Sequence, residues 1–185
     1  MQNFMKIAGG LNVLPIQMAL MRNQHLFGKI SDREFGYVHS EMKDIWVRYN
    51  DYKNMKNDPI AFNEEHDSVW YPAYYALPEL RPLIFWLMAH VEGERLGGIL
   101  ITRIPPGGKI APHIDKGWHA EYYEKYYIPI QNDPGAVFKF EDGEIAPEIG
   151  DVWWFSNANL HAVENNSARD RIALIVCIRS HKLKE

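Results

Sequence analysis

The sequence predicts a mainly β protein with flanking helices, in the form of a double-stranded β-helix of the jelly-roll or cupin type. Short apolar segments separated by turn sequences fill the C-terminal half of the chain. Aromatic residues make up 13% of the sequence, including six Trp and ten Tyr. Aromatic side chains pack well on pleated sheets, and short strands separated by turns are typical of sandwiches and barrels.

The length and composition predict one domain over residues 1–185. At 185 residues and 46% hydrophobic, the chain is large enough to bury a core and too small to divide readily into two domains. Within it, we expect residues 1–95 to form supporting helices and strands, and residues 96–180 to form the jelly-roll core that carries the functional site.

The first supporting elements are a helix and a strand. A helix is predicted over 15–27, because Pro15 suits its first turn and Gly28 follows its apolar pattern. The segment 31–41 begins with a capping box, but an internal glycine argues against a long helix. Residues 42–51 alternate in the period of a strand.

A polar segment and a second helix follow. Residues 51–68 are predicted to be a long surface loop, with a flexible cover as the alternative. Residues 77–93 show the strongest helical pattern, with Pro78 and Pro82 near the start and Gly93 at the end.

From residue 95 onward the pattern changes to short strands. Turn sequences stand at 105–108 and 132–135, with further turns at Gly143 and Gly150. The predicted strands cover 95–104, 121–131, 136–141, 152–156 and 171–179.

Composition and sequence patterns limit the possible binding partners and the cellular location. The formal charge of −4 and the scattered basic residues argue against a nucleic-acid partner. No apolar run approaches the roughly 20 residues of a membrane span, and the N-terminus lacks a signal-peptide pattern. The single cysteine, Cys177, lies in an apolar strand and is expected to be a buried hydrophobic residue. We therefore expect a soluble, cytoplasmic protein.

Four His-x-Asp/Glu tripeptides are present, so this motif must be judged by its context. Residues i and i+2 share a face in a strand but lie about 200° apart in a helix. The tripeptide at His90 lies in a predicted helix and fails this test, as we also expect for His39. The pair His119 and Glu121 stays possible on spacing alone. We prefer the fourth tripeptide, His113-Ile114-Asp115, because it follows a Pro-Gly-Gly turn and an extended segment.

Downstream residues supply the rest of a metal site. His161 follows Asp115 by 46 residues, and two imidazoles with one carboxylate bind Fe(II) on one face and leave positions open. Arg171 begins an apolar strand ten residues later, where an unpaired guanidinium is costly. It suits the distal carboxylate of 2-oxoglutarate, while an edge position facing water or a salt bridge to Asp170 or Asp151 is the alternative.

These residues together resemble a known family. The HID tripeptide at 113–115, His161 in FSNANLHAVEN, the segment RDRIALIVCIR at 169–179 and the turn and strand IGDVWWF resemble the aspartyl/asparaginyl β-hydroxylase family. That family belongs to the Fe(II)/2-oxoglutarate oxygenases and includes bacterial hydroxylases of free proline. The resemblance covers roughly residues 96–180.

The resemblance implies a role for each matching position. Fe(II) would be bound by His113, Asp115 and His161, and 2-oxoglutarate by Arg171 with help from Thr102. Tyr127 stands where some members of the family have a histidine for the same carboxylate. The implied reaction uses O₂ to hydroxylate an amino-acid or peptidyl substrate. Three residues flank the motifs and are candidates for the rim of the site or for structural roles: Trp118, His119 and Asn157.

Two alternatives remain at this point. A cupin oxygenase would use the same metal ligands without 2-oxoglutarate and would need no arginine clamp. A jelly-roll binding protein would carry a vestigial or structural metal site, and structural metal sites are normally closed by protein ligands.

Overall fold

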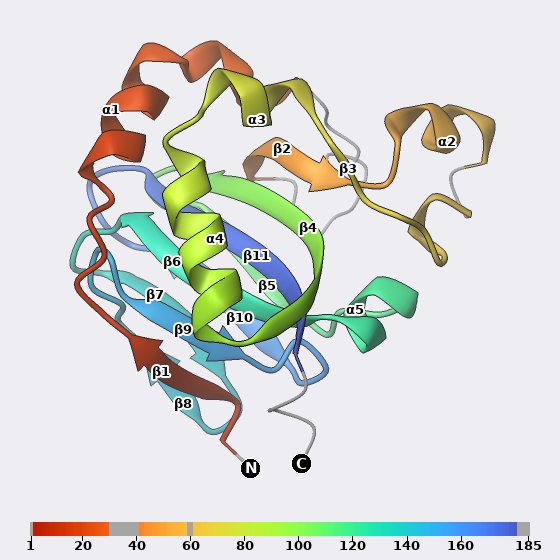
Figure 1. Cartoon of the computed structure of the whole chain (residues 1–185). Helices are drawn as coiled ribbons and strands as arrows, with labels where there is room; N and C mark the ends of the chain where they lie inside the picture. Colours follow the sequence, from red (N-terminus) through yellow and green to blue (C-terminus); the bar gives the residue numbers. More distant parts are fainter. Residues whose placement is uncertain (1, 30–40, 59–60, 181–185) are drawn as a thin grey trace.

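Two antiparallel sheets face each other in the computed structural model, which describes residues 2–29, 41–58 and 61–180 (Figure 1). The larger sheet has the strand order β1-β9-β6-β11-β4-β2-β3 and the smaller the order β5-β10-β7-β8. The larger sheet comprises β1 (Phe4–Ala8), β2 (Lys43–Tyr49), β3 (Val69–Trp70), β4 (Gly93–Ile104), β6 (Glu124–Gln131), β9 (Val152–Phe155) and β11 (Arg171–Ser180). The smaller comprises β5 (Lys109–His113), β7 (Ala136–Phe140), β8 (Gly143–Ile145) and β10 (His161–Asn165). The predicted double-stranded β-helix is confirmed.

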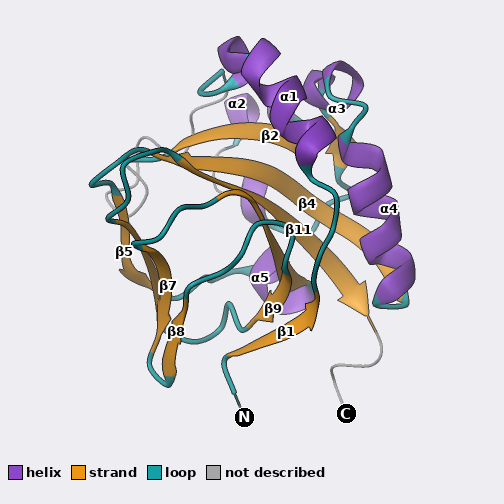
Figure 2. Ribbon diagram, turned by 90° about the vertical axis from the view of Figure 1, so that its left-hand side faces the viewer, coloured by secondary structure: helices purple, strands orange, loops and turns teal. Residues whose placement is uncertain are grey.

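Helices cover the outer face of the larger sheet (Figure 2). They are α1 (Leu14–Arg22), α3 (Pro72–Ala76) and α4 (Leu80–His90). Ile84 and Leu87 on α4 are fully buried and belong to one apolar cluster with Ile101 of β4 and Val176 of β11. Each fully buried apolar side chain contributes about 1.5–3 kcal/mol, so this helical layer fixes the position of the central strands.

The central strand β11 serves two cores, because its side chains alternate between the two faces of the sheet. Ile172, Leu174, Val176 and Ile178 belong to the cluster under the helices. The alternate residues, from Arg171 through Ala173 and Ile175 to Cys177, face the smaller sheet and its cavity. The long strand β4 pairs with β11 from Ile104 opposite Arg171 to Gly93 opposite Ser180. This register sets the floor of the functional site.

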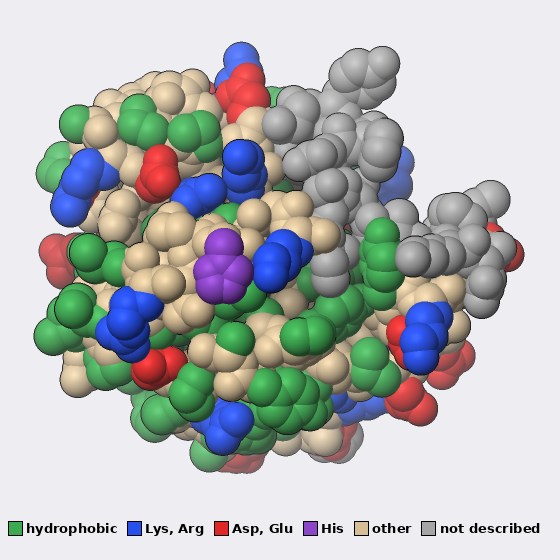
Figure 3. Space-filling view, turned by 90° about the horizontal axis from the view of Figure 1, so that it is seen from above, with side chains coloured by type: hydrophobic (Ala, Val, Ile, Leu, Met, Phe, Trp, Pro, Cys, Tyr) green, Lys and Arg blue, Asp and Glu red, His purple; other side chains and the backbone are tan. Residues whose placement is uncertain are grey.

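The surface above α1 and α3 carries charges of both signs between hydrophobic side chains, and no continuous basic area appears on this face (Figure 3). This distribution agrees with the scattered basic residues of the sequence. Within the described part of the chain, no helix is long and apolar enough to cross a membrane.

Several predicted elements have different bounds in the structure. The helix predicted over 15–27 ends at Arg22, and a short 3-10 turn over Gln24–Leu26 follows it. Gly93 begins β4 instead of ending a helix; the backbone turns one residue earlier, at Glu92, with φ of 51°. The segment 31–41 lies largely outside the described residues.

The loop predicted over 51–68 is wrong in part. It contains the short helix α2 (Tyr52–Asn57), which begins where the Asp51 side chain accepts a hydrogen bond from the Lys53 N–H, and a 3-10 turn over Ala61–Asn63. Asx caps of this kind stabilise helices too short to show apolar periodicity. The strand predicted over 121–131 likewise begins only at Glu124, because α5 (Trp118–Tyr122) precedes it.

Candidate metal centre

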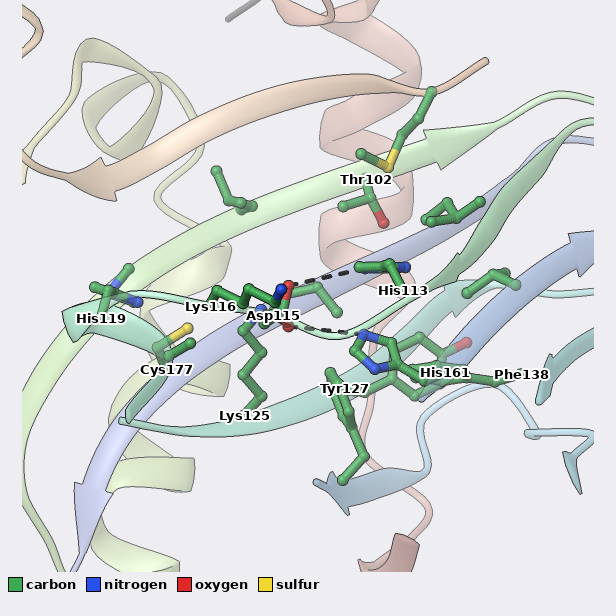
Figure 4. Close-up of a pocket in the computed structure, with 18 of the residues that line it drawn as sticks. Thr102, His113, Asp115, Lys116, His119, Lys125, Tyr127, Phe138, His161 and Cys177 are labelled. Carbon is green, nitrogen blue, oxygen red and sulfur yellow. Dashed lines mark hydrogen bonds and ion pairs between the residues drawn. The ribbon is translucent and has the colours of Figure 1, made fainter. Parts of the chain in front are cut away.

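Three potential metal ligands meet at the open edge of the smaller sheet. His113 ends β5 and His161 begins β10, and the two residues are direct cross-strand partners. Asp115 follows β5 by two residues, with its carboxylate 3.8 Å from His113 Nε2 and 3.6 Å from His161 Nε2 (Figure 4). One donor atom from each residue lies within 4.8 Å of the others, so a single ion can contact all three. The structure therefore brings together the three predicted ligands.

Backbone carbonyls hold both imidazoles in the tautomer that a metal requires. His113 Nδ1 lies 2.9 Å from the carbonyl oxygen of Ala111, and His161 Nδ1 lies 2.8 Å from that of Asn159. A carbonyl oxygen only accepts, so each Nδ1 donates its proton. In the neutral ring the lone pair is then on Nε2, the nitrogen that lies toward Asp115. Hydrogen bonds from the nitrogen that does not bind the metal orient histidine ligands in this way.

The loop that carries Asp115 is fixed by the loop before β10. The Asp115 N–H donates to the carbonyl oxygen of Asn157 over 3.0 Å. The Asn157 side chain in turn donates to the carbonyl oxygen of Ala120 over 2.9 Å. Asn157 is buried and does not line the cavity, so it holds the loop in place and does not belong to the rim of the site.

The electrostatics favour an ionised Asp115 carboxylate and a neutral His161 imidazole. Burial by itself raises the pKa of Asp115, but the charge and hydrogen bond of Lys125 and the two nearby imidazoles outweigh it and lower that pKa to about 2. Burial is also the main reason that the pKa of His161 lies below its usual value. These are the protonation states in which both groups bind metals.

Secondary structure argues against the competing tripeptides at His90 and His119 as metal sites. His90 lies at the end of α4 and stacks on Trp86 with ring centroids 4.6 Å apart. His119 and Glu121 both lie in α5, where the i and i+2 side chains diverge. The tripeptide at His39 falls outside the described residues. Among the described residues, the metal-ligand geometry is met only by the preferred tripeptide with His161.

Arg171 is buried on the inner face of β11. It is 3% exposed, and its Nε has no hydrogen-bond partner among the described residues. Asp170 lies 3.8 Å from Arg103 and Asp151 lies 2.6 Å from Lys6, so neither of the two alternative acids pairs with Arg171. A buried guanidinium with an unused donor is a site for an anion.

Two hydroxyl residues accompany this arginine. The Arg171 guanidinium carbon lies 4.9 Å from the ring centre of Tyr127, whose fully buried hydroxyl has no hydrogen-bond partner in the described chain. Burial raises the pKa of Tyr127, and the charge of Arg171 opposes this shift. Thr102 pairs in register with Ala173, so it too faces inward. Arg171, Tyr127 and Thr102 thus form one polar end of the site.

A cavity of about 240 Å³ joins these groups. Its lining includes His113, Asp115 and His161, the three residues of the polar end, and His119 at its other end. Trp118 does not line it and instead stacks on Tyr122 with centroids 5.0 Å apart.

The lining residues that sequence patterns did not single out include Tyr49, Lys116 and Lys125. Lys125 lies two residues before Tyr127 on the same strand, so strand alternation already placed it on the inner face.

The fold and the site define a double-stranded β-helix protein with a two-histidine, one-carboxylate centre and a buried arginine beside it. Residues 38–180 match the sequence profile of the family described as aspartyl/asparaginyl beta-hydroxylase, and the chain belongs to this family. No curated protein matches the sequence at a significant level.

Solved structures of 2-oxoglutarate oxygenases share the fold at low identity. An oxidoreductase of the 2OG-Fe(II) oxygenase family from Burkholderia pseudomallei is 17% identical, covering 88% of this chain and 78% of its own, with a TM-score of 0.56. A prolyl hydroxylase from Trichoplax adhaerens, solved with a peptide fragment of hypoxia inducible factor, is 12% identical over 96% and 84%, with a TM-score of 0.58. The viral collagen prolyl hydroxylase of Paramecium Bursaria Chlorella virus-1 is 12% identical over 98% and 97%, with a TM-score of 0.54.

Proposed function

We propose that this protein is an Fe(II)- and 2-oxoglutarate-dependent dioxygenase that hydroxylates an amino-acid or peptidyl substrate. The observation that carries the proposal is one cavity holding both a His-Asp-His donor set and a buried arginine that has no acidic partner among the described residues. Membership of the aspartyl/asparaginyl hydroxylase family supports the same reaction type.

The residues of this chain fit both Fe(II) and 2-oxoglutarate, which this reaction needs. His113, Asp115 and His161 offer two neutral nitrogens and one anionic oxygen on one face, the donor set of non-haem Fe(II) oxygenases. Arg171 would hold the distal carboxylate of 2-oxoglutarate through charge-assisted hydrogen bonds, with the hydroxyls of Tyr127 and Thr102 beside it.

When bound, Fe(II) with 2-oxoglutarate and O₂ supplies the oxidising chemistry that converts a substrate C–H bond to an alcohol and releases succinate and CO₂. The protein binds and orients the reactants and excludes water through the apolar walls of Phe138, Phe155 and Val163. No side chain needs to act as a general acid or base.

The two alternatives fit the structure less well. A cupin oxygenase that does not use 2-oxoglutarate leaves Arg171 buried without an anion, which is costly. A structural metal site normally has four protein ligands, whereas the described residues offer three here.

Fe(II)-dependent formation of succinate from 2-oxoglutarate tests the proposal. We expect slow uncoupled turnover in the purified protein without added substrate, and its loss in His113→Ala and Asp115→Ala. Anaerobic titration with Fe(II) and 2-oxoglutarate gives an independent measure of binding. If neither succinate nor 2-oxoglutarate binding is detected, the protein is not a 2-oxoglutarate oxygenase.

A further inference from the structure

The cavity has two chemically different ends. Arg171 and Cys177 both face inward from β11 but stand six residues apart, which is about 20 Å along an extended strand. Cys177 is the register partner of Lys125 on β6. Figure 4 shows Cys177 and His119 on one side of Asp115, and His161 and Phe138 on the opposite side. The end around Lys125 is therefore separate from the end that suits 2-oxoglutarate.

Lys125 is a largely buried ammonium group at the second end. Its Nζ donates to Asp115 Oδ2 over 2.5 Å, and the exposed fractions of the two side chains are 15% and 19%. An ammonium group has three N–H donors, and Asp115 is its only hydrogen-bond acceptor among the described residues. A metal bound by Asp115 would draw on the same negative charge, which leaves Lys125 in need of a second anion.

The charges of the side chains that line the cavity also indicate a site for a second anion. Three cationic side chains, Lys116, Lys125 and Arg171, line it together with one carboxylate, that of Asp115. In the described chain neither Lys116 nor Arg171 forms a salt bridge. The two charges of a divalent metal and those of the 2-oxoglutarate dianion offset each other, so the positive excess remains. A substrate carboxylate placed beside Lys125 would offset part of it.

His119 lies on the same side of Asp115 as Cys177 (Figure 4), and the side chains around it are closely packed. His119 is 9% exposed, its Nε2 accepts a hydrogen bond from the Gly98 N–H over 3.0 Å, and its ring packs 5.0 Å from that of Tyr49. A Cβ at Gly98 would lie 3.0 Å from the Tyr49 ring and 3.1 Å from His119 Nε2. The whole cavity, at about 240 Å³, is also smaller than the roughly 300–1,000 Å³ of common ligand sites. A compact molecule fits this space better than a length of peptide.

We propose that Lys125 is a substrate-binding residue that receives a carboxylate of a small amino-acid substrate, with Lys116 at the rim of the same subsite. This inference rests on the proposed function, because it assigns the end of the cavity that 2-oxoglutarate leaves open. Lys125 keeps one hydrogen bond to Asp115 and directs its other donors to the substrate.

The test uses the whole protein loaded with Mn(II) and 2-oxoglutarate, since Mn(II) accepts the same nitrogen and oxygen donors. Calorimetric titration with the standard free amino acids, and with the α-carboxamides of those that bind, measures how much the carboxylate contributes to the binding affinity. We expect the carboxylate forms to bind about 10- to 100-fold more tightly, the range for a hydrogen bond between charged groups. An acidic amino acid whose α-carboxamide binds equally well would place its side-chain carboxylate at Lys125.

Variants of Lys125 test whether this residue causes the preference for carboxylates. Lys125→Gln retains a donor for Asp115 but removes the charge, so the preference for carboxylates should disappear while the affinity for 2-oxoglutarate changes less than about threefold. Lys125→Arg should restore much of the preference. The control is Lys139→Gln, since Lys139 forms a comparable 2.7 Å ion pair with Glu164 outside the cavity and should have no effect.

Three outcomes overturn the inference. The first is that the wild-type protein binds an amino acid no more tightly than any of its amide forms, whether the α-carboxamide or, for Asp and Glu, the side-chain amide. The second is that peptides, titrated in the same way, bind while no free amino acid does. The third is that Lys125→Gln loses as much affinity for 2-oxoglutarate as for the amino acid. The wild-type comparison decides the matter even if a Lys125 variant fails to fold. Failure of the wild-type protein to bind Mn(II) and 2-oxoglutarate would instead reject the proposed function.

Discussion

At the scale of single residues, Arg171 is the group whose surroundings are most informative. Its side chain is almost wholly buried against Tyr127, yet it forms no salt bridge with any described residue. A permanently charged guanidinium is tolerated in such a place when a ligand completes its contacts.

Replacement of this arginine tests that reasoning. Arg171→Met should weaken binding of 2-oxoglutarate by about 10- to 100-fold, because charge-assisted hydrogen bonds are lost. Metal affinity should change little. Anaerobic titration of the Fe(II)-loaded protein measures both quantities. Arg169→Met is the matched control, since Arg169 pairs with Asp133 on the surface; equal effects of the two variants would count against the assigned role of Arg171.

Asp115 gives the metal-free protein a predictable acid sensitivity. Its pKa falls from 3.8 to about 2 on folding, so the ionised carboxylate stabilises the fold by about 2 kcal/mol above pH ~4. A lowered folded pKa means that this contribution disappears as the pH falls from about 4 to about 2. Urea unfolding of the wild-type protein and of Asp115→Asn measures it. The difference between the two free energies of unfolding should be constant above pH ~4 and shrink below it.

At the scale of elements, helix α4 supports the central strands from outside. Leu87 is fully buried in the cluster beneath it, whereas Phe85 on the same helix is 50% exposed. The helix therefore contributes through one face, and the site on the opposite side of the sheet depends on that support.

Two substitutions on this helix compare how much its buried and exposed faces contribute to stability. Leu87→Ala should lower the free energy of unfolding by about 2–5 kcal/mol, because it leaves a cavity among the packed side chains. Phe85→Ala should cost less than about 1 kcal/mol. Chemical denaturation measures both, and similar losses from the two variants would contradict the observed packing.

At the scale of the whole molecule, metal binding and folding should be coupled. His113 and His161 come from β5 and β10, strands that meet only in the folded sheet, so the unfolded chain lacks the assembled site. A metal at 100 times its dissociation constant stabilises the folded state by about 2.7 kcal/mol.

Thermal unfolding with and without Mn(II) measures this coupling. The midpoint temperature of the wild-type protein should rise with the Mn(II) concentration, and that of His161→Ala should not. His90→Ala provides the control, because His90 lies on α4 away from the site. A shift of equal size in the wild-type protein and in His161→Ala would show that the metal binds elsewhere.

Strand alternation and turn spacing were sufficient to predict a jelly roll and the strands β2, β4, β6, β7, β9 and β11. Extended spacing favoured His113 with Asp115, whereas His161 was added by the chemistry of a metal site and by the family resemblance. In the structure β5 ends at His113, and Asp115 reaches the same place from the loop that follows. Several short elements were missed, among them α2, α5, β1 (Phe4–Ala8) and β10, since elements of five or six residues depend on caps and on pairing with distant strands.

Only the tertiary structure decided which groups share the cavity. The burial of Arg171 without an acidic partner among the described residues depends on where Asp151 and Asp170 find other partners. The contact of Lys125 with Asp115 depends on the register between β6 and β11 and on the path of the loop after β5. Such contacts join residues from separate strands, and local sequence patterns do not contain the distance between them. The sequence therefore determined the kind of candidate metal site, and the packing of the two sheets determined what surrounds it.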